Sequence, residues 1–390
     1  MNINRLVKVF QRFKFSGKMK EIKNILFVHD HHPIDGGGVE VNTFSVAKEL
    51  VKQGYDVTIA TSISSCYESK TGFRPLKSEE HEGVIIEFVA STESLENLIK
   101  KHDVVHSQIT FSLHPACLYT MEYCDKIGKI HFASVRTAPD FVPFSSLSQD
   151  SEFGVAVAMK RTRELLNSKL CIVSVPATFM IDSLEKNVGV INEINVIHNG
   201  IPELEKPESR KIQTDLLYLG HMASKKGVDY IIEAVHLLRK KHPQIKVTMA
   251  GSGHRAIFLR SLIKKLGLKD NFIFQEYVPH ARINELINST KALLLPSLTE
   301  VWPAVILEGL YFGKTVIASD VGGIPEMLDD GKRGLIFKSR DVKDLAKKID
   351  EALTNKEIVK KFSNQENHPF KIDQQVDELL GMYSRTLNAY

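Results

Sequence analysis

Apolar residues along the chain fall mostly into short runs typical of buried strands, each followed by a polar turn and a segment with helical spacing. The run Lys291–Ser297 (KALLLPS) leads into a polar turn at Leu298–Glu300. A helix is expected to begin at Pro303, because proline is favoured at the first helical position. A second strand, Thr315–Ser319, leads into a turn at Gly322–Glu326. Ligands of open α/β sheets bind at the carboxyl ends of the parallel strands in such a strand–helix–strand unit.

The same alternation continues on both sides of this unit and indicates an α/β fold with parallel sheets. Further strands are expected at Asn24–His29, Asp56–Thr61, Gly83–Val89, Asp103–His106, Lys129–Val135, Leu170–Val175, Ile194–Ile197, Leu216–Leu219, Lys246–Ala250, Phe272–Gln275 and Gly334–Phe337. Helices are expected at Pro115–Ile127, Gly154–Asn167, Val228–Lys241, Ile257–Leu266, Val342–Leu353 and Asp373–Leu387, and around Val41, Phe44, Ala47 and Leu50.

The length of 390 residues exceeds what one hydrophobic core usually supports, so two domains are expected. We place the first domain at residues 24–202 and the second at residues 215–370. Residues 203–214 (ELEKPESRKIQT) are charged and contain proline, which is typical of a linker. Residues 371–390 are expected to form a separate C-terminal helix.

The composition is that of an ordinary soluble globular protein, with 43% hydrophobic and 25% charged residues. No apolar run reaches the roughly 18 residues of a membrane span, and residues 1–23 lack the apolar core of a signal peptide. The cysteines, Cys66, Cys117, Cys124 and Cys171, show no C-x-x-C spacing, so we expect reduced, buried thiols in a cytoplasmic protein. A net charge of +4 without a zinc or RNA-binding motif gives no reason to expect a nucleic acid partner.

The N-terminal segment, residues 1–23, is basic, with seven Lys or Arg against one Glu. Its apolar residues fall at helical spacing, at Leu6, Val9, Phe10 and Phe13. Two interpretations stay open: an amphipathic helix that lies on anionic lipid at the inner face of the membrane, and a solvated leader that packs loosely on the first domain. Met19 is an alternative start, since the first expected strand follows soon after it.

Two carboxylates, Glu300 and Glu308, stand in the central strand–helix–strand unit. Between them, the free backbone N–H groups of Trp302, Ala304 and Val305 are expected to point out of the helix start. Amides and the helix dipole bind phosphates, and carboxylates accept hydrogen bonds from sugar hydroxyls. The pattern therefore favours a nucleotide-diphosphate sugar as the ligand. The alternative is that Glu300 caps the helix and Glu308 faces solvent.

The string E-x7-E at Glu300 and Glu308, followed by GKTVIASDVGGIPE, resembles the donor-site signature of glycosyltransferase family 4, retaining enzymes of the GT-B fold. The resemblance covers residues 24 to 385 and is strongest from 216 to 338. It implies two Rossmann-like domains with the active site in the cleft between them, and a last helix that crosses back onto the first domain. It also implies that Glu300 holds the transferred sugar and Glu308 the ribose.

In the second domain, the family usually has G-R-x4-K-G, with Arg and Lys both on the diphosphate. The resemblance implies this role for Lys226, whereas His221 replaces the Arg, so its phosphate contact is expected to be weaker or pH-dependent. Gly251, after a strand, is expected to admit the nucleotide close to the backbone. The resemblance implies that the backbone of the loop containing Val278 contacts the nucleotide base. The alternative is that Val278 is an ordinary core valine. Pro303 lies between the amides expected to bind the donor and is counted among the expected donor-binding residues.

In the first domain, the turn DGGGVE resembles the family's first loop, which faces the sugar and the acceptor. Glycines there let backbone N–H groups approach a ligand, so Gly37 and Gly38 are expected at the donor. His31 and His32 precede this turn and are expected on the acceptor side, with an ordinary surface histidine as the alternative. The string VIHNGIP, which includes His198, resembles the family's interdomain segment.

Two further positions depart from the family pattern. Gln108 stands where a His is common, and the family's His beside the reacting sugar aligns with Arg136 or has no equivalent in this chain. Arg cannot act as a base, so Arg136 is expected to stabilise the departing phosphate or to bind an anionic acceptor, with Gln108 on the acceptor side. The loop at residues 140–152 is expected to cover the cleft, with ordinary surface as the alternative.

The resemblance implies retaining transfer of a hexose from UDP-glucose, UDP-N-acetylglucosamine or GDP-mannose to a hydroxyl of a glycan, a lipid-linked acceptor or a small metabolite. No D-x-D stands at a strand end, so no metal and no other cofactor is expected. Two alternatives stay open. One is a related GT-B epimerase or hydrolase of nucleotide sugars, and the other is a non-catalytic partner protein that keeps the fold, as the departures at Arg136 and His221 suggest.

Overall fold

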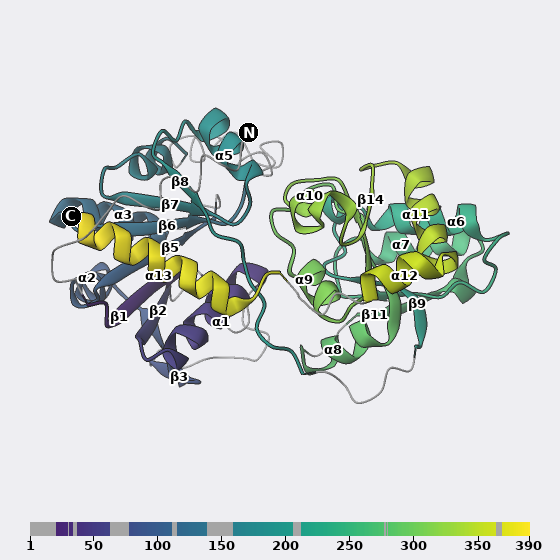
Figure 1. The fold of residues 1–390 in the computed structure, drawn as a ribbon, viewed down its shortest axis with the longest axis horizontal. Coiled ribbons are helices and arrows are strands. Elements are labelled where there is room, and N and C mark those ends of the chain that lie inside the picture. The colour runs from purple at the N-terminus through teal and green to yellow at the C-terminus, as the bar shows by residue number, and fades with distance from the viewer. Residues whose placement is uncertain are drawn as a thin grey trace.

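The computed structural model describes residues 21–29, 31–33, 37–62, 78–110, 115–138, 159–205, 212–276, 278, 280–363 and 369–390. They form two α/β domains arranged along the long axis of the molecule (Figure 1). The segment 1–20, with most of the expected lipid-binding helix, and the expected cleft loop 140–152 lie outside the described residues. The predictions made for them stay predictions.

Within the described residues, the first domain holds an eight-stranded sheet in the order β3-β4-β2-β1-β5-β6-β7-β8. Strand β3 pairs antiparallel with β4, and the remaining pairs are parallel. The strands are β1 (Asn24–His29), β2 (Asp56–Ser62), β3 (Glu79–His81), β4 (Val84–Val89), β5 (Val104–Ile109), β6 (His131–Val135), β7 (Cys171–Val175) and β8 (Ile194–Val196).

Helices cover both faces of this sheet. One face packs on α2 (Thr92–Lys101), α3 (Pro115–Ile127) and α5 (Phe179–Ser183) through a core that includes Ile99, Met121 and Met180. The other packs on α1 (Gly38–Lys52) through Val46, Ala47 and Leu50. Buried strands of β-branched residues between two helical layers explain why the sequence reads as near-continuous apolar runs.

The second domain holds a parallel sheet in the order β11-β10-β9-β12-β13-β14, as far as the structure describes it. Its strands are β9 (Thr214–Leu219), β10 (Val247–Ala250), β11 (Phe272–Gln275), β12 (Thr290–Leu295), β13 (Thr315–Ser319) and β14 (Leu335–Phe337). On one face pack α6 (Val228–Leu238), α7 (Ala256–Lys265), α11 (Val342–Thr354) and α12 (Lys356–Ser363), and on the other α8 (His280–Asn288), α9 (Ala304–Tyr311) and α10 (Ile324–Met327).

The last helix, α13 (Ile372–Ala389), leaves the second domain and lies along the first domain (Figure 1). Val376, Leu379 and Tyr383 pack into the same core as α1. The buried Tyr383 hydroxyl also pairs with Nδ1 of His106 on β5 at 2.5 Å. The chain therefore passes between the domains twice, once toward the second domain and once back.

The structure corrects two local expectations around the central unit. Pro303 is not the first helical residue, because its ψ of 120° is extended; α9 begins at Ala304, and Pro303 precedes it. The expected turn at Gly322–Glu326 contains the short helix α10, with Pro325 in its first turn, where proline is tolerated. Outside the central unit, the helix expected at Val228–Lys241 ends earlier, at Leu238.

Cys117, Cys124 and Cys171 are buried, and no disulfide joins them in the described part of the chain; Cys66 lies outside the described residues. Among the helices that the structure describes, none combines the length and the apolar character that crossing a membrane requires.

Candidate active site

The strand order of the second domain reverses between β9 and β12, which are neighbours in the sheet although β10 and β11 follow β9 in the chain. At such a switch point the loops after the two strands lead to opposite faces, and ligands of open α/β sheets bind between them. Lys226 lies in the loop after β9 and Glu300 in the loop after β12. The fold therefore brings both side chains to the place where a ligand is expected.

Lys226 and Glu300 form an ion pair at this switch point. Lys226 Nζ donates to Glu300 Oε1 at 2.6 Å, and Ser297 Oγ donates to the same oxygen at 2.7 Å. Glu300 is buried, with 9% of its surface exposed, whereas 24% of the Lys226 side chain is exposed. No side chain caps α9 by a hydrogen bond, so Glu300 binds the ammonium instead of capping the helix.

Two glycines allow the loops to close tightly around this pair. Gly227 has φ +60°, and a Cβ there would lie 2.0 Å from the Pro296 carbonyl oxygen. Gly322, after β13, has φ +57°, and a Cβ there would lie 1.7 Å from the carbonyl oxygen of Glu300. Neither position has room for a side chain, so the loops after β9, β12 and β13 meet through bare backbone.

The start of α9 presents free amides beside the pair. The Ile306 N–H donates to the Pro303 carbonyl at 3.1 Å, but the N–H groups of Trp302, Ala304 and Val305 have no backbone carbonyl partner in the described part of the chain. Such orphan donors carry the positive end of the helix dipole. The geometry needed for an anion is therefore present, and the contact itself stays a prediction.

Glu308 lies half-buried inside α9. Burial raises the pKa of its carboxyl from 4.5 to about 7. No side-chain hydrogen bond or ion pair to this carboxylate occurs within the described residues, which leaves it with unused acceptor capacity. A hydroxyl donor such as a ribose would supply the missing hydrogen bond without adding charge.

The remaining donor candidates of the second domain surround the loop after β10. His221 is exposed, with its ring centroid 6.3 Å from that of His254. Gly251 has φ +125°, and a Cβ there would lie 2.1 Å from the carbonyl oxygen of Gly220, so the loops after β9 and β10 touch. Val278 is half-buried and packs against the apolar core under α9, as a core valine does. Its contact with the base stays a prediction.

Arg136, after β6, lies in a buried network of amide side chains. Its Nε donates to Gln108 Oε1 at 2.6 Å and its Nη2 to Asn42 Oδ1 at 3.4 Å, while Nη1 donates to Asn199 Oδ1. Burial lowers the pKa of Arg136 to about 10, although Tyr383 and Glu40 act to raise it. The guanidinium thus joins β5, α1 and the interdomain segment. Its expected contact with a phosphate or an acceptor stays a prediction.

The acceptor-side histidines differ in their surroundings. His31 is exposed, whereas His32 is buried and stacks on Phe88, with ring centroids 5.8 Å apart. Gly37 precedes α1 and Gly38 is its first residue, without a side-chain hydrogen bond at the cap. A Cβ on Gly38 would meet no atom within 4 Å among the residues that the structure describes.

The side chains that join the two domains were not predicted from the sequence. Glu326 on α10 accepts hydrogen bonds from Thr178 and His198, and the Trp302 ring stacks on His198. Trp302 was expected to act only through its amide. His198 and Glu326 lie in the strings HNGIP and GGIPE, which resemble family motifs. Neither string indicates that these two side chains contact each other.

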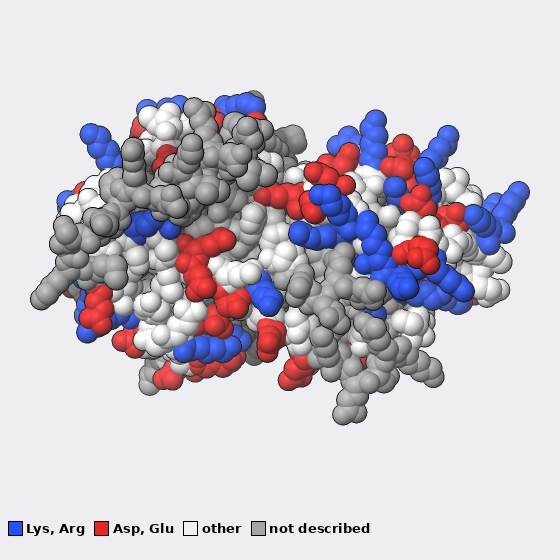
Figure 2. Space-filling view, in the orientation of Figure 1, with Lys and Arg blue, Asp and Glu red and all other residues white. Residues whose placement is uncertain are grey.

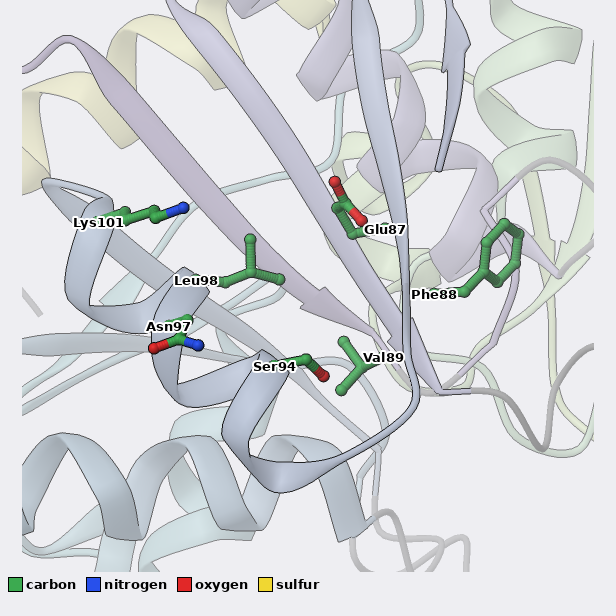
Figure 3. A pocket seen from close by; sticks show the side chains of 7 residues that line it. All are labelled: Glu87, Phe88, Val89, Ser94, Asn97, Leu98 and Lys101. Atoms are coloured by element: carbon green, nitrogen blue, oxygen red, sulfur yellow. The ribbon is translucent and has the colours of Figure 1, made fainter. Parts of the chain in front are cut away.

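A separate pocket of about 220 Å³ lies in the first domain between the end of β4 and α2 (Figure 3). It is lined by Glu87, Phe88, Val89, Ser94, Asn97, Leu98 and Lys101. Figure 3 shows Phe88 pointing to the other side of β4 from Val89. The proposed donor residues do not line this pocket.

Charge is distributed unevenly over the surface. Figure 2 shows a band of Lys and Arg side chains crossing the second domain on the face viewed, close to the waist between the domains. Positive surface of this kind attracts anionic ligands over distances of about 10 Å.

Two family models match the chain, one on each domain. The model described as Glycosyltransferase Family 4 matches residues 36–203, and the model described as Glycosyl transferases group 1 matches residues 202–368. Together they span both parallel-sheet domains and include Lys226, Glu300 and Glu308.

The chain is also similar in sequence to individual glycosyltransferases. The gpi3 subunit of phosphatidylinositol N-acetylglucosaminyltransferase from Schizosaccharomyces pombe is 23% identical over 75% of this chain and 65% of its own length. Glycogen synthase from Mycobacterium tuberculosis is 30% identical over 63% of this chain and 58% of its own. The chain thus spans less than two thirds of either relative.

A solved structure shows the same fold. The Anabaena protein Alr3699/HepE, crystallised with UDP, superposes with a TM-score of 0.71 at 17% identity, covering 93% of this chain and 100% of that one. The two family models, the order of motifs and the pair of facing parallel sheets lead to one conclusion. The chain belongs to the group 1 glycosyltransferases of glycosyltransferase family 4, and its fold is GT-B.

Proposed function

We propose that the protein is a retaining glycosyltransferase that moves a hexose from a nucleotide-diphosphate sugar to a hydroxyl of a glycan, glycolipid or small-molecule acceptor. The observation that carries the proposal is the Lys226–Glu300 pair at the switch point of the second domain, next to the free amides of α9. A cation and a helix start suit a diphosphate, and the neighbouring carboxylate suits sugar hydroxyls.

The diphosphate lies between Lys226 and the amides of Ala304 and Val305. In the ligand-free protein the Lys226 ammonium is already paired with Glu300 at 2.6 Å. An incoming phosphate therefore shares an ammonium that Glu300 holds in place, which limits the side-chain ordering that binding requires. As the bond to the sugar breaks, charge develops on the leaving diphosphate, and the same groups stabilise it.

The two carboxylates take different parts of the donor. Glu300, beside the ammonium, orients the hexose through its hydroxyls. Glu308, whose pKa burial raises to about 7, accepts hydrogen bonds from the ribose. Both assignments follow the E-x7-E resemblance and fit the position of Glu308 inside α9 and of Glu300 before it.

The acceptor hydroxyl attacks the anomeric carbon from the face that the phosphate leaves, and a phosphate oxygen takes its proton, so the configuration is retained. The charge on the leaving group is neutralised by Lys226 and amides, so the reaction as proposed requires no metal ion. Transfer is accordingly expected to continue in excess EDTA; loss of activity that magnesium or manganese restores would contradict this part of the proposal.

Related proteins support the ligand class without naming the ligand of this chain. Alr3699/HepE has been crystallised with UDP-glucose, and the S. pombe relative is named for N-acetylglucosamine transfer to phosphatidylinositol. UDP-glucose, UDP-N-acetylglucosamine and GDP-mannose are therefore the first donors to test. A lipid-linked acceptor fits with peripheral binding to an anionic membrane through residues 1–23, on the cytoplasmic side.

The proposal is tested first by a thermal-shift screen of these three donors, followed by product analysis with the donor that raises the melting temperature most. Transfer with retained configuration at the anomeric carbon is the expected result. Consumption of donor without any acceptor would instead identify an epimerase or a hydrolase. Donor binding without turnover on any acceptor class would identify a non-catalytic partner.

Two variants separate donor binding from chemistry. Lys226→Met is expected to weaken nucleoside diphosphate binding by about 10- to 100-fold, the value of a charge-assisted hydrogen bond, whereas Lys225→Met on the neighbouring exposed lysine serves as the control. Glu300→Gln is expected to lower transfer by about 100-fold or more without weakening diphosphate binding, because the ammonium is no longer shared. Unchanged turnover in either variant would remove that residue from the chemistry.

A further inference from the structure

Glu326 forms a hydrogen-bonded connection between the domains. It lies on α10 of the second domain, and its Oε2 accepts from the backbone N–H of Thr178 at 2.8 Å. Its Oε1 accepts from Thr178 Oγ1 at 2.7 Å and from His198 Nε2 at 2.8 Å. One carboxylate therefore binds three donors of the first domain and of the segment that leaves it.

The hydrogen bonds to this carboxylate favour its charged form. Burial alone would raise the pKa of Glu326, but the hydrogen bonds from His198 and Thr178 lower it below 4.5. About a third of each of the Glu326 and His198 side chains is exposed, 29% and 33% respectively, so the pair forms at the edge of the interface and is not sealed inside it. Such a pair can break and reform without exposing a core.

The residues before α10 transmit the position of Glu326 to the donor site. A Cβ on Gly322 would lie 1.7 Å from the carbonyl oxygen of Glu300, and one on Gly323 would lie 2.2 Å from that of Val301. Backbone in such close contact cannot move toward the Glu300 turn without displacing it. A displacement of Glu326 therefore displaces the turn that carries Glu300.

Trp302, on the same turn, contacts the interdomain segment directly. Its Nε1 donates to the Asn199 carbonyl at 3.0 Å, its ring stacks on His198 with centroids 4.6 Å apart, and it meets the edge of Phe370 at 5.0 Å. Phe370 lies just before α13, where the chain returns to the first domain. Trp302 thus touches both segments that pass between the domains.

We propose that Glu326 is a positioning residue that holds the donor-binding turn, residues 300–303, against the first domain through Thr178, His198 and Trp302. In this way the hexose bound at Glu300 is presented to the acceptor side, which the first domain carries. The inference rests on the proposed glycosyl transfer and adds to it the residues that set the register between the two domains. Its predicted signature is a loss of turnover without a comparable loss of nucleoside diphosphate affinity, because the Ala304 and Val305 amides assigned to the diphosphate belong to α9 and not to the turn at residues 300–303.

The chain contains one tryptophan, so the fluorescence of Trp302 reports this interface without any label. In the full-length, ligand-free protein, Glu326→Ala is expected to raise the acrylamide quenching constant of Trp302 about twofold or more. Glu326→Gln, which keeps an acceptor oxygen and the side-chain length, is expected to restore most of the protection. Glu357→Ala removes an exposed carboxylate on α12 and is the matched control.

The same variants are then compared in transfer and in binding of UDP or GDP. Glu326→Ala is expected to lower kcat by about 10- to 100-fold and to change diphosphate affinity by less than about threefold, with substantial recovery in Glu326→Gln. Thr178→Val, which removes a single donor, is expected to give a smaller loss of about threefold to fivefold and provides the test if Glu326→Ala does not fold. Equal turnover in both variants and wild type, or a parallel loss of diphosphate affinity, would overturn the positioning role.

The two proposals fail in different ways. If the wild-type protein transfers hexose but quenching and kcat are unchanged in Glu326→Ala, the positioning role is wrong and the proposed function stands. If the wild-type protein transfers no hexose from any nucleotide sugar, while Glu326→Ala still exposes Trp302, the interface is as described, the proposed function is wrong and the positioning role falls with it.

Discussion

At the scale of single residues, the two carboxylates of the E-x7-E string have opposite electrostatic surroundings. Glu300 accepts from an ammonium and a hydroxyl. Glu308 has neither within the described residues, and burial raises its pKa to about 7. Glu300, which holds a cation, and Glu308, which has acceptor capacity for a neutral hydroxyl, are suited to the two ends of a nucleotide sugar.

This contrast predicts an unusual stability effect for Glu308→Gln. A carboxyl whose pKa in the folded protein lies above its ordinary value favours folding at low pH, and this contribution is lost as pH rises from 4.5 through about 7. The substitution is therefore expected to raise the free energy of unfolding by about 1 to 3 kcal/mol at pH 8 and to leave it nearly unchanged at pH 4. Urea unfolding at the two pH values measures this.

In the same variant, affinity for the donor is expected to fall about threefold to tenfold, because an amide is a weaker acceptor for ribose hydroxyls than a carboxylate. Glu357→Gln, on an exposed helix face, is the control. A stability gain of the same size at both pH values would show that the buried charge is not its cause.

Sequence motifs predicted that Lys226, Glu300 and Glu308 share one site, but they did not predict the contact between Lys226 and Glu300. Lys226 and Glu300 are 74 residues apart, and no local pattern encodes that their side chains meet. The surroundings of Arg136 could be predicted even less. Its three amide partners come from an earlier strand, a helix and the interdomain segment, so its burial follows from tertiary packing alone.

At the scale of elements, the site depends on loops that approach each other through glycine backbone. Strands of the central unit were predicted within about two residues, since buried parallel strands have a clear apolar pattern. The short helix α10 was missed because Gly-Gly-Ile-Pro is typical of a turn. Helices α2 and α8 were also not expected. In α2 the buried Leu95 and Ile99 are four residues apart and follow the capping Ser91, so the sequence of this helix did contain a helical signal.

The close approach of these loops predicts different costs for two glycine substitutions. Gly267→Ala introduces a side chain at φ +70° with nothing within 4 Å, so it is expected to cost only the left-handed strain of about 1 to 2 kcal/mol. Gly322→Ala adds to a similar strain a contact at 1.7 Å with backbone. It is expected to lower the free energy of unfolding by at least about 3 kcal/mol and to abolish transfer, whereas Gly267→Ala keeps transfer.

Chemical unfolding and the transfer assay check both variants. Equal stability of the two would mean that the loop after β13 moves freely away from the Glu300 turn. In that case the rigid contact between these loops would not exist in solution.

At the scale of the whole molecule, polar side chains organise the crossing between the domains. Asn42 and Gln375 exchange hydrogen bonds between α1 and α13, and Gln375 also accepts from the Gly200 N–H at 2.7 Å. Arg136 joins this network through Asn42 and Asn199. Two domains and a linker were expected from length and composition, but these contacts depend on how α13 and the interdomain segment pack onto the first domain, which no sequence pattern specifies.

Arg136→Met removes all donors of the guanidinium from this network. It is expected to lower the free energy of unfolding by about 2 to 4 kcal/mol, because the buried amide oxygen of Gln108 and the half-buried one of Asn199 lose that donor. Arg282→Met, at an exposed arginine of α8, is the control and is expected to change stability by less than about 0.5 kcal/mol. Unchanged stability together with a loss of transfer would instead favour direct contact between Arg136 and the acceptor or the phosphate.

The most direct measurement for the whole account is a crystal structure of the protein with a bound nucleoside diphosphate. The account predicts phosphate oxygens within hydrogen-bonding distance of the Ala304 and Val305 N–H groups, with Lys226 Nζ on the opposite side of the phosphates and Glu308 accepting from the ribose. Phosphates bound elsewhere, with protein side chains filling the space at the start of α9, would contradict it.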